Sequence, residues 1–184
     1  SLNQRTPTTA TMDPDADHLL VLTRGPEGYH RLSRAIASAH LATGAKGERD
    51  YGRGVGLDPL EVLAEAADGN WLILTGCRKG TVRRALANQG ESAALSELER
   101  LVSLFGKDNV AVEITDQARP EDSRRNDALV EIARSVGLPV VATGAVHAAT
   151  PRDGHLADAL AAIRARSSLD AIDGWLPPHP AILR

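Results

Sequence analysis

The fold class is decided by the stretch Gly137-Leu138-Pro139-Val140-Val141-Ala142-Thr143-Gly144-Ala145-Val146-His147. An amphipathic helix precedes it, because apolar residues recur there at helical spacing: Leu129, Ile132, Ala133 and Val136. Gly137 suits the left-handed position after a helix, and Pro139 prevents the helix from resuming. The β-branched run over 140–143 predicts a strand buried on both faces. His147 then follows the carboxyl end of that strand, where ligands and catalytic groups gather in α/β folds.

The same alternation of strands and helices extends through the rest of the chain. Further strands are predicted over 18–23, 71–75 and 110–115, and helices over 26–42, 59–67, 81–89, 91–105 and from just after Asp122 to Val136. A capping box at Thr150–Asp153 opens a last helix with one apolar face, formed by Leu156, Ala159, Leu160 and Ile163. About four strands separated by helices predict an α/β fold with a mostly parallel sheet under helical cover.

Three regions are expected along the chain. Residues 1–16 are rich in Thr, Pro and Asp and predict a flexible lead-in. Residues 17–176 form the α/β domain, and residues 177–184 form an irregular, Pro-rich end.

Composition narrows the classes of function. With 42% hydrophobic and 24% charged residues, the 184-residue chain resembles an ordinary soluble protein, and its net charge of −3 gives no overall attraction to DNA or to anionic membranes. No apolar run reaches ~18 residues, so no membrane span is expected. The single cysteine excludes an intrachain disulfide, and no signal peptide is visible, which favours the cytoplasm.

Several polar residues are candidates for chemistry. Glu113 lies within an otherwise apolar strand, where a carboxylate must be paired, hydrogen-bonded or bound to a metal. The other metal-ligand candidates are Asp116, His147, Asp153 and His155, a donor set that suits Zn, Mn or Fe. Cys77 in its Gly-Cys turn is interpreted as a small buried residue. A basic cluster forms either a solvated helix face or a weak DNA-binding patch: Arg78, Lys79, Arg83 and Arg84.

Ordered motifs point to a known family: Gly25-Pro26-Glu27-Gly28-Tyr29-His30-Arg31-Leu32, then Leu74-Thr75-Gly76-Cys77-Arg78-Lys79-Gly80, then the segment 126–143. Together they resemble the PHP domain of bacterial C-family DNA polymerases, the polymerase III alpha subunits. The segments 77–80 and 162–170 most resemble the actinobacterial error-prone, damage-induced branch. The resemblance implies a partial form of a distorted β/α barrel. In intact members this barrel carries a polynuclear metal site, and in some it acts as a 3′–5′ exonuclease.

The sequence departs from that family pattern at the expected metal ligands. The early His-x-His and Thr-Asp-His motifs are absent, so we expect the amino-terminal third of the domain to be missing. A family histidine falls at Gln117, an Asn-Asp pair falls at Gly144-Ala145, and another histidine falls at Ala157. The resemblance therefore implies a degenerate metal site, with His147, Glu113, Asp116, His155 and Asp153 as its vestiges.

Three hypotheses follow. The preferred hypothesis is a scaffold within an error-prone polymerase. In this hypothesis the chain has no catalytic residue of its own, and no cofactor is expected. Its partners are the remaining domains of the polymerase, through which it meets DNA indirectly. The second is a metal-dependent phosphoesterase that uses Mn²⁺ or Zn²⁺, and the third is a DNA-binding module. Because four strands cannot close the barrel, we also expect self-association through an exposed sheet edge.

Overall fold

The computed structural model describes residues 17–44, 49–117, 119–146 and 149–171. Its strands are β1 (Leu20–Thr23), β2 (Trp71–Leu74), β3 (Val110–Thr115) and β4 (Val140–Thr143). Its α-helices are α1 (Gly25–Thr43), α2 (Pro59–Ala67), α3 (Thr81–Gln89), α4 (Glu91–Phe105), α5 (Asp122–Val136) and α6 (Pro151–Ala165). Short 3₁₀ turns are η1 (Arg53–Val55), η2 (Lys107–Asn109) and η3 (Leu169–Ala171). The predicted alternation of four strands with helices is confirmed.

The predicted helix boundaries come from local signals that the structure contains. The Asp58 carboxylate accepts a hydrogen bond from the backbone N–H of Leu60 at the start of α2. Gly137 adopts the left-handed conformation after α5, with φ of 67°. Thr150 and Asp153 form the predicted capping box of α6. These contacts satisfy backbone groups that a helix end leaves unpaired.

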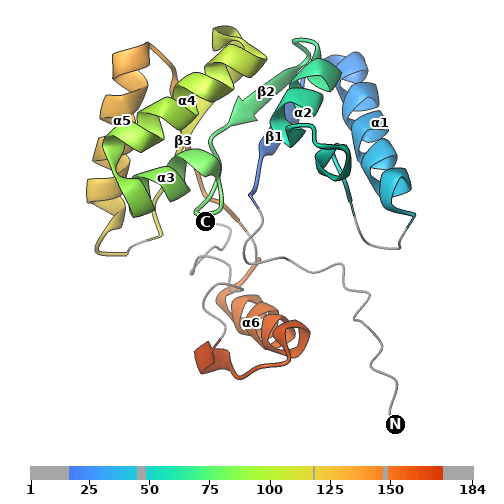
Figure 1. Ribbon diagram of the computed structural model, residues 1–184. Coiled ribbons are helices and arrows are strands. Elements are labelled where there is room, and N and C mark those ends of the chain that lie inside the picture. Colours follow the sequence, from blue (N-terminus) through green and yellow to red (C-terminus); the bar gives the residue numbers. More distant parts are fainter. Residues whose placement is uncertain (1–16, 45–48, 118, 147–148, 172–184) are drawn as a thin grey trace.

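The sheet has the order β1-β2-β3-β4 and is mostly parallel, as predicted. Strands β2, β3 and β4 run parallel, whereas β1 is antiparallel to β2, with Thr23 opposite Trp71. The reversed strand has a simple cause. Helices α1 and α2 follow β1 and bring the chain back to the end of the sheet where β1 stops (Figure 1). Strand β2 therefore starts beside the end of β1 and runs in the opposite direction.

The core lies between one face of the sheet and the helices. Alternate residues of β2 and β3 supply its centre, and helices α3, α4 and α5 cover it with Val82, Leu98, Leu101 and Leu129, all fully buried. In Figure 1, α3, α4 and α5 form one group of helices and α1 and α2 a second group, while α6 lies apart from both. Within the described residues, no helix is both long and apolar enough to cross a membrane.

The prediction that the strand over 140–143 is buried on both faces is wrong. Strands β1 and β4 alternate between exposed and half-buried residues, and Leu22 is 48% exposed. These strands are the edges of the sheet, so one of their faces lacks helical cover. The predicted apolar face of α6 is also exposed, at Leu156, Leu160 and Ile163. A local sequence pattern identifies an apolar face but does not say whether another element covers it.

Helix α1 is fixed to β2 by a close backbone contact. The indole Nε1 of the fully buried Trp71 donates a hydrogen bond of 2.9 Å to the carbonyl of Gly28. The backbone N–H of Arg24 donates to the carbonyl of Asn70 at 2.8 Å. A Cβ at residue 28 would lie only 2.4 Å from that same Asn70 oxygen. Glycine is therefore required here for close packing.

We expect Gly28→Ala to destabilise the chain by about 1–3 kcal/mol, because the added methyl overlaps a backbone oxygen that cannot move alone. Alanine favours helices over glycine by about 1 kcal/mol, so an ordinary helix site would give the opposite sign. Urea unfolding measures the change, with Ser33→Ala on the exposed face of α1 as the control. A stabilised Gly28→Ala protein would contradict the close contact.

We also expect the chain to self-associate through β1, which pairs with β2 alone within the described sheet and exposes Leu20 and Leu22. Light scattering at high protein concentration should report a mass above that of the monomer, and Leu22→Asp should lower it. Leu41→Asp, which changes an exposed leucine of α1, is the control. A monomeric wild-type chain would refute the prediction.

Candidate functional site

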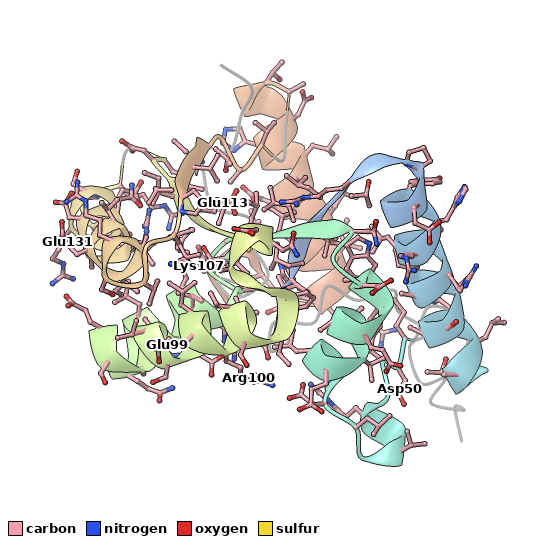
Figure 2. All side chains as sticks on the ribbon, turned by 90° about the horizontal axis from the view of Figure 1, so that it is seen from above. Asp50, Glu99, Arg100, Lys107, Glu113 and Glu131 are labelled. Carbon is pink, nitrogen blue, oxygen red and sulfur yellow. The ribbon has the colours of Figure 1, made fainter. Side chains whose placement is uncertain are left out.

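Glu113 is buried on the sheet face opposite the helix-covered core. Its side chain is 3% exposed, and its Oε1 accepts a hydrogen bond of 2.5 Å from the Thr143 hydroxyl of β4. Its backbone N–H donates to the hydroxyl of Thr75 at 2.9 Å, which fixes the strand next to the end of β2. Figure 2 shows Glu113 inside the molecule, whereas Glu131 and Asp50 lie at its periphery. Hydrogen bonding, one of the alternatives drawn from the sequence, is therefore present at Glu113.

A second buried carboxylate organises the carboxyl end of β3. Asp122, 2% exposed at the start of α5, accepts hydrogen bonds from the backbone N–H groups of Gln117 at 2.6 Å and Arg119 at 3.2 Å. Its other oxygen accepts from Arg125 Nη1 at 2.5 Å. Arg125 Nη2 donates in turn to the carbonyl of Thr115 at 2.6 Å. The loop between β3 and α5 is thus held by one carboxylate and one guanidinium.

The pKa of Asp122 lies below its ordinary value. Burial alone would raise it, but the hydrogen bonds from the Gln117 N–H, the Arg125 guanidinium and the Arg119 N–H outweigh burial and lower the pKa. The carboxylate is therefore charged at neutral pH.

Arg83 of α3 approaches the same strand end. Its Nη1 donates to the Thr115 hydroxyl at 3.1 Å. Burial, followed by the positive charge of Arg125, lowers the pKa of Arg83 to about 10, although Cys77, Asp122 and Glu113 act in the opposite direction. The guanidinium remains charged at neutral pH. We call Arg83, Glu113, Thr115, Gln117, Asp122, Arg125 and Thr143 the strand-end site.

Gln117 occupies the position at which the family resemblance implies a histidine. It is buried, and its side-chain amide donates to the carbonyl of Gly144 at 2.8 Å. The residue therefore joins the loop after β3 to the loop after β4. An imidazole there could bind a metal ion, whereas this amide acts as a link between two protein segments.

The remaining metal-ligand candidates are spread over the structure. Asp116 follows β3 and is exposed, and Asp153 belongs to the capping box of α6, where its carboxylate accepts from the backbone N–H of Thr150 at 3.1 Å. His155 is exposed on α6, and His147 lies outside the described residues. Among the side chains that the structure describes, no group of three or more His, Cys, Asp and Glu residues could hold a metal ion.

The basic cluster does not form one exposed surface. Lys79 is buried, Arg78 is half-buried, and Arg83 points to Thr115. Arg84 makes an ion pair of 2.6 Å with Asp17. Nearby, the half-buried thiol of Cys77 lies 3.5 Å from Nδ1 of His18, a contact that the sequence did not suggest.

Sequence reasoning identified Glu113, named Arg83 only as a member of the basic cluster, and missed Asp122 and Arg125. A signal for the latter pair was present, because an aspartate at a helix start followed three residues later by an arginine favours an ion pair on one helix face. No comparable signal existed for Arg83, whose partner Thr115 is 32 residues away.

Comparisons with known proteins identify the family of the chain. The PHP domain family matches residues 6–117, and the chain belongs to this family. The error-prone DNA polymerase of Cutibacterium acnes is 51% identical over 174 residues, which cover 95% of this chain and 15% of that protein. The corresponding proteins of Mycolicibacterium paratuberculosis and Nocardia farcinica are 51% identical over 170 and 178 residues. These two matches cover 92% and 94% of this chain, respectively, and 15% of each relative.

The family implies a metal centre, so the fit of the strand-end site to metal ions can be tested. Two guanidinium groups, Arg83 and Arg125, meet at Thr115, and Asp122 is engaged as the partner of Arg125. The carbonyl oxygen of Gln117 belongs to an amide already joined to Gly144, and Glu113 is held by Thr143. This donor set does not fit a polynuclear metal centre.

We expect Asp122→Asn to destabilise the chain by about 3 kcal/mol at neutral pH, because Arg125 would lose its buried counter-charge. The folded-state pKa of Asp122 lies below the ordinary value of 3.8, so its stabilising contribution is complete above that value and is lost as pH falls through the folded pKa.

The difference in unfolding free energy between wild type and Asp122→Asn should therefore shrink below about pH 4. Denaturant unfolding across pH measures it, with the exposed Asp127→Asn on the same helix as the control. A difference that is constant with pH would refute the charged role of Asp122.

Proposed function

We propose that this chain is the PHP-domain part of a damage-induced, error-prone DNA polymerase, in which it serves as a scaffold. The chain spans about 15% of the length of the curated relatives, which are named error-prone DNA polymerases. In this proposal, nucleotidyl transfer belongs to other domains of such a polymerase, and these domains are the partners of the PHP domain. A polymerase of this kind acts in the cytoplasm.

One observation supports the scaffold role above the others. Side chains at the strand ends bind neighbouring protein segments: Glu113 to Thr143 and Gln117 to Gly144. Both links connect β3 and its following loop to β4 and its following loop. Such direct contacts between protein segments hold the sheet end together, which supports the scaffold role.

Thermal unfolding with and without Mn²⁺ or Zn²⁺ tests this proposal. A metal at 100 times its Kd would add about 2.7 kcal/mol of stability and raise Tm by several degrees. For a metal-independent scaffold we expect the same Tm in either ion and in EDTA. His147→Ala and Glu113→Gln are measured in parallel, each against its own metal-free Tm.

A rise in Tm that disappears in His147→Ala would overturn the metal-independent scaffold and favour the phosphoesterase alternative, with Mn²⁺ or Zn²⁺ as the cofactor. A rise that persists in both variants would show metal binding elsewhere in the chain. Release of nucleotides from single-stranded DNA, measured with the same ions, separates metal binding from exonuclease activity.

A further inference from the structure

Cys77 and His18 form a pair of side chains that neither the strand-end site nor the scaffold role uses. The thiol sulfur of Cys77, in the turn after β2, lies 3.5 Å from Nδ1 of His18, which precedes β1. Cys77 is half-buried and His18 is exposed, so the pair is open to small molecules from solution. A nucleophile within hydrogen-bond reach of a base is the arrangement that activates thiols in proteins.

The backbone holds the two side chains together. The N–H of His18 donates to the carbonyl of Lys79 at 2.9 Å, and the N–H of Gly80 donates to the carbonyl of Cys77 at 2.8 Å. A Cβ at residue 80 would lie only 2.1 Å from the carbonyl oxygen of Thr75, so the turn is packed too tightly for another residue there. The imidazole and the thiol therefore meet because their two segments are joined, and not as two flexible surface side chains.

The surroundings of His18 keep its imidazole neutral. Partial burial, followed by the positive charge of Lys79, lowers the pKa of His18 below its ordinary value of 6.5. Arg78 acts in the same direction, and Asp17 acts in the opposite one. At neutral pH the ring is thus uncharged, and in the tautomer with its hydrogen on Nε2, Nδ1 can accept the hydrogen of the thiol.

The charges near Cys77 suit an anionic sulfur. Arg78 and Lys79 follow it directly in the chain. Cys77 is also the group that most raises the pKa of Arg83 against the effects of burial and of Arg125. These cations would stabilise the negative charge that develops on the sulfur as it loses its hydrogen, and the thiolate is the reactive form of cysteine.

We propose that Cys77 is a modification site at which His18 acts as the base and a hydroperoxide, such as hydrogen peroxide, is the reagent. Nδ1 of His18 takes the thiol hydrogen, and the sulfur attacks one peroxide oxygen, so that an S–O bond forms while the O–O bond breaks. The other oxygen leaves as hydroxide and takes the proton from His18 to become water. The sulfur is oxidised by two electrons to a sulfenic acid, and the peroxide is reduced. A small, neutral reagent suits a half-buried sulfur.

This proposal goes beyond the scaffold role and does not depend on it. The metal titration reads thermal stability, whereas the thiol chemistry is read at one side chain, so the two tests fail separately. Cys77 is the only cysteine of the 184-residue chain, and every thiol signal therefore comes from it.

The first test measures the rate of alkylation of the full chain by excess iodoacetamide, followed by mass spectrometry across pH. At neutral pH we expect His18→Gln to react at least ~10-fold more slowly than wild type. His30→Gln, which changes an exposed histidine of α1, is the matched control and should react like wild type. The wild-type rate should fall only as pH drops through the pKa of His18, below 6.5. The rate of His18→Gln should fall about tenfold per pH unit from neutral pH downward, as for a simple thiol.

The second test treats the same proteins with hydrogen peroxide and traps the sulfenic acid with dimedone. We expect wild type and His30→Gln to be trapped faster than His18→Gln. Equal rates or equal pH profiles for wild type and His18→Gln would overturn the role of His18. Alkylation without a trapped sulfenic acid would overturn the choice of a hydroperoxide.

A comparison that needs no variant protects against a folding defect of His18→Gln. Folded wild type should be alkylated faster at neutral pH than wild type unfolded in urea, although its thiol is half-buried, because only the folded chain brings His18 to Cys77. A folded chain that reacts no faster than the unfolded one would overturn the proposal.

Discussion

The buried carboxylate of Asp122 is the contact on which the carboxyl edge of the sheet depends. It binds two backbone N–H groups of the loop that leaves β3 and, through Arg125, the last carbonyl of that strand. The loop, the strand and the helix α5 therefore share one anion. Because Thr115 is fixed in this way, its hydroxyl meets Arg83, and Gln117 is placed to reach Gly144. The strand-end site follows from that single buried charge.

The strand ends of this PHP domain have to be held in place at the edge of the sheet. In this chain, direct protein contacts do so: a hydroxyl bound to Glu113 and an amide that bridges two loops. Both contacts join β3 or its following loop to β4 or its following loop, so they hold neighbouring segments of the sheet edge together.

Much of the fold could be predicted because its signals are local. Asp58, Gly137 and Thr150 each satisfy backbone groups within a few residues, so the sequence alone locates those helix ends. Glu113 could be singled out as a polar residue in an apolar strand. Its partner Thr143 could not, because that contact depends on the register of β3 and β4. The same holds for Trp71 and Gly28, 43 residues apart, and for the exposure of the edge strands.

The reversed direction of β1 has a consequence for how the chain reaches its own site. An antiparallel first strand begins, rather than ends, at the edge that carries the ends of β2 and β3. His18 therefore lies against the turn after β2, where its backbone N–H donates to the carbonyl of Lys79 at 2.9 Å. The polypeptide enters the domain beside the strand-end site and not on its far side. Together with the 3.5 Å contact between the Cys77 thiol and Nδ1 of His18, this hydrogen bond ties the first described residues of the domain directly to the turn that follows β2.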